Sequence, residues 1–311
     1  MLSSGVLVAI LTSILFALAD ATIRSALRFT TPIMASLLVV AIQWVIYTGI
    51  ILATGEFSAL NLPGLLWFIL AGLLNPLLFL TFFLLGIQRI GVARSAPIKS
   101  SAPIYAVIFA VAFLGERPEP LQYLGIVLVV AGVITISAEG GGAWRKVYGI
   151  FSRENPSAPR SLPSEGSSWR KMDILFPLLA GLSSGIASNL FKVSLGHLPS
   201  PLLGAWVGVA EGLLLFPLLS FLYPKGERFR LLPPAWPWLL LGSLSATAAV
   251  YGLFLSISLG QVSIVFTLIQ TSPLFVLLIS ALFLRQMERV TPGLVFGAIL
   301  TVGGGALVSA F

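Results

Sequence analysis

Ten apolar stretches divide the sequence, and each has about the length that crosses a bilayer as an α-helix, roughly 20 residues. Hydrophobic residues make up 57% of the 311 positions and charged residues only 9%, which leaves too few polar side chains to cover a water-facing surface. The sequence therefore predicts an all-α polytopic protein with ten transmembrane helices, a multi-pass protein of the cell (inner or plasma) membrane. The predicted spans are 5–23, 33–54, 64–86, 92–114, 120–138, 174–194, 202–222, 236–257, 262–284 and 292–310.

The cysteine, histidine and charge content indicates which metals, cofactors and macromolecules the chain can bind. The chain has no cysteine and a single histidine, His197, so thiolate sites and multi-histidine metal clusters are excluded, and we expect neither metal nor cofactor. The formal charge is +7, but the basic residues lie in short connections between apolar runs, where anionic lipid headgroups are the nearer partner. We therefore expect contact with the lipid bilayer and none with nucleic acid. The N-terminus, Met1–Gly5, lacks a basic region and predicts a retained first helix.

The two halves of the chain repeat each other. A shift of 168 residues aligns Gln43 with Glu211, and a shift of 170 residues aligns Pro103 with Pro273. Each half holds five spans, an odd number, so the second half enters the membrane from the opposite side. The sequence therefore predicts two inverted five-helix repeats.

The repeats are predicted at residues 1–138 and 174–311, with a connecting segment at 139–173. This segment contains three consecutive glycines, several serines and prolines, and six basic residues. Such a composition predicts a basic, flexible linker.

Spans four and nine each contain a proline shortly after a hydroxyl pair. A proline inside a membrane helix frees a backbone carbonyl, which a nearby hydroxyl can occupy. Interrupted helices at matching places in two halves are typical of a transporter's binding site. We expect the two spans to bend there and to face each other across a central cavity. The hydroxyl pairs and prolines are Ser100-Ser101 before Pro103 and Thr271-Ser272 before Pro273.

The end of the first repeat carries a further pattern, Phe113-Leu-Gly-Glu-Arg117, followed by Gly125 and Gly132. With the two halves and the interrupted spans, this pattern resembles the EamA-type members of the drug/metabolite transporter superfamily. The resemblance covers the chain outside the linker and implies a secondary transporter of small metabolites, commonly an exporter of amino acids. The second repeat departs from the pattern at Arg285-Gln-Met-Glu-Arg289, where the resemblance leads us to expect a Gly-Glu pair.

Three charged residues are candidates for the substrate cavity. Glu211 lies near the middle of span seven, where an ionisable side chain normally faces a cavity or a partner. It either lines the cavity, where it would carry a coupling proton, or is a protonated or hydrogen-bonded structural carboxyl. Lys99 lies in span four, where it either points inward toward an anionic group or extends along the helix toward the membrane surface. Lys192 in span six has the same two interpretations. The uncharged residues of the predicted lining are Gln43, Asn75, Ser100, Tyr105, Asn189, Tyr251, Gln270 and Thr271.

Three functions compete. The sequence contains no phosphate-binding Gly-x-x-x-x-Gly-Lys-Ser/Thr loop, which favours a secondary transporter with a small-molecule substrate over an ATP-driven one. Gly181–Gly185 matches the Gly-x-Ser-x-Gly pattern of serine hydrolases, but a membrane helix does not supply the strand-to-helix turn on which that pattern works. The third function is a lipid-handling or assembly subunit of the same fold. The sequence does not distinguish import from export, or a monomer from a homodimer.

The loop charges predict an orientation. Almost all basic residues of the connections lie in the odd-numbered ones, and the even-numbered ones carry only Arg117. The positive-inside rule therefore predicts that the odd connections, the linker included, are cytoplasmic and both termini outside. The family resemblance implies the opposite, because bacterial relatives usually keep both termini inside.

Overall fold

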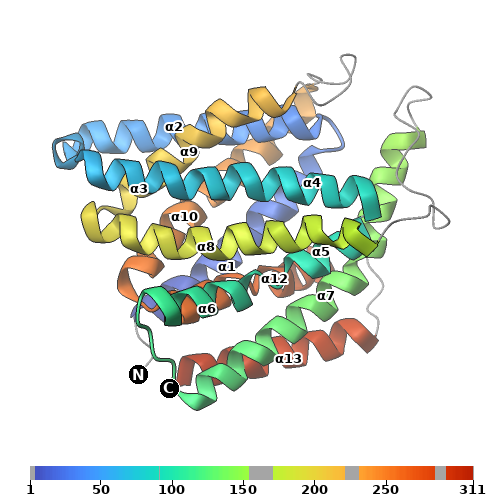
Figure 1. Cartoon of the computed structure of the whole chain (residues 1–311). Coiled ribbons are helices and arrows are strands. Elements are labelled where there is room, and N and C mark those ends of the chain that lie inside the picture. The colour runs from blue at the N-terminus through green and yellow to red at the C-terminus, as the bar shows by residue number, and fades with distance from the viewer. Residues whose placement is uncertain (1–3, 91, 154–170, 221–230, 284–291, 311) are drawn as a thin grey trace.

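A computed structural model describes residues 4–90, 92–153, 171–220, 231–283 and 292–310. Its regular secondary structure is helical apart from one isolated bridge between Thr30 and Leu231. Within these described residues, six helices are long and apolar enough to cross a membrane, and four shorter apolar helices accompany them, which confirms the predicted all-α polytopic fold (Figure 1). The helices are α1 Ser4–Ala26, α2 Pro32–Thr54, α3 Leu62–Gly72, α4 Phe79–Ile90, α5 Val92–Lys99, α6 Ala102–Phe113, α7 Pro120–Arg153, α8 Leu175–His197, α9 Pro201–Ser220, α10 Trp236–Leu259, α11 Val262–Ile269, α12 Ser272–Phe283 and α13 Pro292–Ala310.

Local sequence fixes where α2 begins and ends. The Thr31 hydroxyl accepts a hydrogen bond from the Met34 amide at 3.4 Å, and Pro32 occupies the first turn, where its missing N–H costs nothing. At the other end Gly55 has φ 71°, in the left-handed region that favours glycine, and its amide bonds to the Ile51 carbonyl at 2.9 Å. Both ends of this helix are therefore set by capping residues next to the apolar run.

Spans four and nine are each built from two helices. Span four breaks between α5 and α6 at residues 100–101, and span nine breaks between α11 and α12 at residues 270–271. Each break lies two residues before a proline, Pro103 or Pro273. Proline lacks the amide hydrogen of a regular helix and its ring clashes with the preceding turn, which explains both positions. The two broken spans touch, because α6, which follows the first break, packs directly against α11, which precedes the second.

In each break a hydroxyl takes over a carbonyl from the disrupted turn. Ser101 Oγ donates to the Ile98 carbonyl at 2.7 Å, and Thr271 Oγ1 donates to the Leu268 carbonyl at 2.6 Å. Both bonds reach back three residues, so the two breaks share one hydrogen-bond pattern.

Span three differs from the continuous helix that the sequence predicts over 64–86. A π-helical turn, Leu73–Leu78, separates α3 from α4, and Asn75 within it has the non-helical angles φ −143° and ψ 107°. The cause is Pro76, because a residue that precedes a proline is pushed out of the helical region. Span three therefore bends near its middle.

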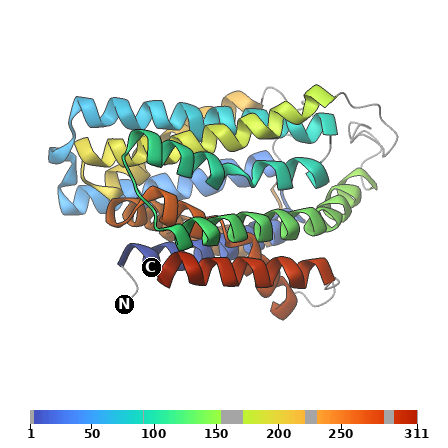
Figure 2. The ribbon, with the colours of Figure 1, turned by 60° about the horizontal axis from the view of Figure 1, so that its bottom comes forward.

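Helices of the two repeats are interleaved. The two most extensive contacts pair α7 with α13 and α1 with α10, and α6 with α8 and α2 with α9 also pack together; each of these pairs joins one helix from either repeat. Figure 2 shows α7 and α13 running side by side. They touch through backbone: a Cβ on Gly125 would lie 2.8 Å from the Gly304 carbonyl oxygen, and one on Gly132 would lie 2.6 Å from the Gly297 carbonyl oxygen. Glycines at these crossings therefore allow the repeats to approach closely.

The predicted linker differs in its first part. α7 continues through Arg153, so residues 139–153 are helical, although three glycines occur within them. No proline interrupts the sequence between Pro120 and Pro156, which removes the strongest helix-breaking residue from this stretch. A short 3₁₀ helix, Lys171–Ile174, precedes α8, and residues 154–170 lie outside the described part of the chain.

The bundle has two ends that differ in the segments they carry. The first and last described residues lie at one end (Figure 1), together with the connections 55–61, 114–119, 198–200 and 260–261. We call this the termini end. The opposite end holds the C-terminus of α7 and the N-terminus of α8, and we call it the linker end.

Candidate substrate site

Glu211 lies in the middle of α9 with its carboxylate against Gly72, the last residue of α3. A Cβ atom on Gly72 would overlap this carboxylate, so the contact requires glycine. Both carboxylate oxygens are buried, and neither has a hydrogen-bond partner among the described residues. A buried carboxylate without a partner costs free energy unless it binds a proton or a cation. The environment of Glu211 therefore favours uptake of a positive charge.

Asn75 forms the bend of span three, three residues beyond Gly72. Its side-chain amide donates to the Ser184 hydroxyl of α8 at 3.1 Å. The π-helical turn around Asn75 also contacts α9, the helix that carries Glu211. The structure thus brings the predicted residues Asn75 and Glu211 to the same segment of span three.

Lys99 is the last residue of α5 and lies at the break of span four. Its ammonium lies 5.4 Å from the ring centroid of Phe79 and 4.8 Å from that of Phe83, both in α4. The faces of these rings attract a cation and stabilise it away from water. Lys99 therefore contacts span three on the other side of the bend from Glu211.

Two glycines of α8 pack against the break of span four. A Cβ on Gly181 would lie 3.1 Å from the Lys99 carbonyl oxygen, and a Cβ on Gly185 would lie 2.8 Å from the Ala102 carbonyl oxygen. One turn on, the Asn189 amide nitrogen donates to the Ala106 carbonyl at 3.1 Å and to the Gly185 carbonyl at 2.9 Å. The Asn189 side-chain oxygen is buried without a partner among the described residues. Asn189 thus ties α8 to α6 and keeps one acceptor available.

The predicted residues at the second break lie in a largely buried environment. Thr271 is buried, and its hydroxyl lies 3.1 Å from the Ser13 hydroxyl of α1. All eight residues of α11, which precede the break, are buried. Gln270 is half-buried at the end of that helix.

The remaining predicted lining residues are spread over the bundle. Ser100 and Gln43 are buried, and Tyr105 is half-buried with its Cβ against the position of Gly185. Tyr251 is 38% exposed on the face of α10 that also exposes Leu244. The described contacts do not connect Tyr251 with the residues around the bend of span three.

The profile of the EamA-like transporter family matches residues 3–138 and 171–310. The chain belongs to this family. The two matched segments correspond to the two helical repeats, and the stretch between them contains the end of α7.

Known proteins similar to this EamA-like chain agree with the assignment. An uncharacterized transporter of Synechocystis sp. is 26% identical over 230 residues, which cover 73% of this chain and 66% of the relative, so the chain spans about two thirds of that protein. An uncharacterized transporter of Sinorhizobium sp. is 30% identical over 95 residues, 30% of this chain and 67% of the relative. A solved structure titled "Crystal structure of protein" has the same fold, with a TM-score of 0.76 at 18% identity, and the match covers 100% of this chain and 97% of that one.

Lys192 has a different environment in the EamA-like fold from the predicted cavity. Its ammonium donates to the carbonyls of Ile257, Ser258 and Gly260 at 2.6, 3.3 and 2.9 Å. These carbonyls end α10, so the lysine reaches the termini end of the bundle and neutralises the negative end of that helix dipole.

Sequence reasoning did not identify Glu116 as a contact residue. Its carboxylate accepts the backbone amides of Val262 and Ser263 at the start of α11. The available signal was the acidic residue within the Phe113-Leu-Gly-Glu-Arg117 pattern, which the family resemblance used only as a marker of fold. Phe79 and Phe83 were likewise missed, because nothing local to them indicates a lysine partner.

The Gly-x-Ser-x-Gly match in α8 serves helix packing. Ser183 donates to the Leu179 carbonyl at 2.8 Å, and Ser184 accepts from Asn75. His197 stacks on Trp67 with ring centroids 6.3 Å apart, at the termini end. A serine hydrolase needs a base within hydrogen-bond reach of the serine, and among the described residues these two serines have other partners.

Proposed function

We propose that this membrane protein is a secondary transporter that exports a small zwitterionic metabolite, an amino acid or a related compound, by alternating access between its two repeats. Family membership and the two interrupted spans support the transport mechanism. The observation that carries the substrate class is the Glu211 carboxylate, buried and without a partner among the described residues.

The charged residues around span three suit a substrate that carries one positive and one negative charge. Glu211 contacts this span at Gly72, before the bend, and Lys99 contacts it at Phe79 and Phe83, after the bend. Gly72 and Phe79 are seven residues apart and lie on either side of the bend at Asn75. A small zwitterion is therefore proposed to contact the two charges in succession, its ammonium at Glu211 and its carboxylate at Lys99.

Glu211 is also the proposed site of the coupling proton. A carboxyl that alternates between a proton and a substrate ammonium never remains buried as an unpaired charge, so the exchange avoids the cost of burying a bare carboxylate. Export then follows from proton entry at one side and substrate release at the same side.

The proposed location is the cell (inner or plasma) membrane with the linker end in the cytoplasm, on the basis of the basic connections. Ser157, which lies outside the described residues, offers a test in a chain without native cysteine. In intact cells, an impermeant thiol reagent should leave Ser157→Cys unlabelled. Labelling from outside would reverse the orientation.

The deciding experiment is transport by the purified protein in vesicles. Exchange of a labelled panel of amino acids and small metabolites is measured with and without a proton gradient, against empty vesicles and against Glu211→Gln. Glu119→Gln is the matched control, because Glu119 is exposed in the connection before α7. Uptake that never exceeds empty vesicles for any compound would favour a lipid-handling or assembly role.

A further inference from the structure

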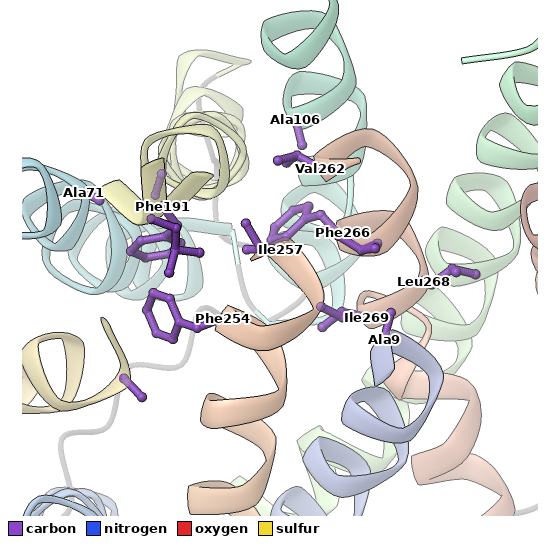
Figure 3. Close-up of a cluster of buried hydrophobic side chains, with 14 of the residues drawn as sticks. Ala9, Ala71, Ala106, Phe191, Phe254, Ile257, Val262, Phe266, Leu268 and Ile269 are labelled. Atoms are coloured by element: carbon purple, nitrogen blue, oxygen red, sulfur yellow. The ribbon is translucent and has the colours of Figure 1, made fainter. Parts of the chain in front are cut away.

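The turn between α10 and α11, Gly260-Gln261, is held from both sides by charged residues. Lys192 donates to three carbonyls at the C-terminus of α10, as described above. Figure 3 shows Ile257 before this turn and Val262 after it, with Ala106 of α6 beside Val262. The turn therefore lies against the first repeat at the termini end of the bundle.

Glu116 holds the other side of the turn. One carboxylate oxygen accepts the Val262 amide at 2.6 Å, and the other accepts the Ser263 amide at 2.9 Å and the Ser263 hydroxyl at 2.6 Å. These are amides of the first turn of α11, which have no partner within their own helix. A carboxylate there satisfies them and complements the positive end of the helix dipole.

Local sequence explains how Glu116 reaches α11. Gly115 has φ 68°, a left-handed conformation that reverses the chain at the end of α6. The Leu114 and Glu116 amides both bond to the Ala110 carbonyl, at 3.0 and 3.2 Å, which fixes the reversed segment to α6. The Gly-Glu pair thus turns the chain and presents the carboxylate to the second repeat.

The bonds of Glu116 cross the boundary between the repeats. Glu116 belongs to the first repeat, and α11, whose amides it accepts, belongs to the second. Other contacts across the boundary lie at the same end: Asn61 donates to the His197 carbonyl at 2.9 Å, and Ser200 bonds to Glu56. The termini end is therefore closed by polar contacts that a relative movement of the repeats would break.

We propose that Glu116 and Lys192 are positioning residues of the gate at the termini end: Glu116 holds the α10–α11 turn against the first repeat, Lys192 fixes the same turn to α8 of its own repeat, and the contact with the first repeat opens once in each transport cycle. The gate rests on the proposed alternating access. Neither residue touches the substrate in this mechanism. They set how long the termini end stays closed.

The test measures opening directly with single cysteines. Val265 is fully buried one turn into α11, and Val39 is buried in α2 toward the linker end. Each is replaced by cysteine in the full-length protein in nanodiscs, where both faces are accessible, and the rate of labelling by a maleimide is recorded. Glu116→Gln places an amide NH₂ against a backbone N–H and should raise the labelling rate of Val265→Cys about tenfold, with a similar effect of Lys192→Met. Val39→Cys should not label faster.

Control variants distinguish opening of the gate from a general loss of packing in the fold. Glu116→Asp keeps the charge and should restore most of the slow labelling, and Glu119→Gln should change nothing. Faster labelling at both Val265→Cys and Val39→Cys would identify a loosened fold and overturn the gate. Unchanged labelling of Val265→Cys in both Glu116→Gln and Lys192→Met would do the same. Because labelling needs no substrate, an open gate in a protein that transports nothing would contradict the proposed function alone.

Discussion

The breaks in spans four and nine share a backbone pattern and differ in charge. Each has a hydroxyl, Ser101 or Thr271, that donates to the carbonyl three residues before it. At the position just before the two break residues, the first repeat has Lys99 and the second has the buried Ile269. The bend therefore does not depend on the charge. The repeat supplies the bend in both halves, and the first repeat adds a cation to it.

The side chains around the two breaks also differ, in burial and in the partners they offer. The second break follows the fully buried α11 and is bonded to Ser13 of α1. The first break lies beside the aromatic rings of α4 and close to the bend of span three. We infer that the second break is a structural joint and the first is part of the substrate site.

Exchanging the two residues is the strongest way to break this comparison. Ile269→Lys would bury an ammonium among apolar side chains and should lower the free energy of unfolding by about 3–5 kcal/mol. Lys99→Ile copies the second break and should leave the protein folded while weakening substrate binding. Thermal unfolding and the yield of monodisperse protein check the stability of both variants. Exchange in vesicles checks the substrate binding of Lys99→Ile. If Ile269→Lys were as stable as the parent, the second break would also face a polar space.

Glu211 sharpens the comparison at a second place, because its equivalent in the first repeat is the neutral Gln43. Glu211→Gln keeps the shape of the side chain and should leave the protein folded while lowering flux about tenfold or more. If the carboxyl carries the coupling proton, the remaining exchange should lose its dependence on pH. If it only binds a substrate ammonium, affinity should fall and the pH profile should stay. Parent rates with the parent pH profile would exclude both roles.

Gly72 and its equivalent Gly242 compare the two repeats at a smaller scale. A Cβ on Gly72 would overlap the Glu211 carboxylate, whereas one on Gly242 would only crowd Ile23 Cγ1 at 2.9 Å and the Thr22 hydroxyl at 3.0 Å. Gly72→Ala should cost about 1–3 kcal/mol and reduce flux. Gly242→Ala should change stability less and leave flux intact, and Gly49→Ala, which meets nothing within 4 Å, is the neutral control. An equal loss of flux in Gly72→Ala and Gly242→Ala would mean that the contact with Glu211 has no special role.

The parts of the fold that depend on local chemistry could be predicted from the sequence. The apolar spans follow from length and composition, and the breaks in spans four and nine follow from proline chemistry at Pro103 and Pro273. The same reasoning applied to Pro76 would have found the bend of span three. Asn75 was instead considered only as a polar lining residue.

The contacts of the site depend on which helices pack together, and the residues that meet in this packing are far apart in the sequence. Lys192 binds carbonyls 65 to 68 residues away, and Glu116 binds amides 146 and 147 residues away. A charged residue inside or beside a span indicates that it needs a polar partner, but the sequence does not identify the residue that supplies it. For this reason the sequence left two interpretations of Lys192 open, and only the fold shows that its ammonium lies at the end of α10.

The smallest expected difference concerns the hydroxyls of the two breaks. Ser101→Ala removes one hydrogen bond to a neighbouring carbonyl and should cost about 0.5–1 kcal/mol. Thr271→Val removes the equivalent bond and also leaves the buried Ser13 hydroxyl without this partner, so it should cost about 1–2 kcal/mol. A double-mutant cycle with Ser13→Ala isolates the second contribution, because the energy of the contact appears only as the non-additive part. Equal costs for the two single changes, with no coupling to Ser13, would show that the two joints are held alike and that the charge at Lys99 is their whole difference.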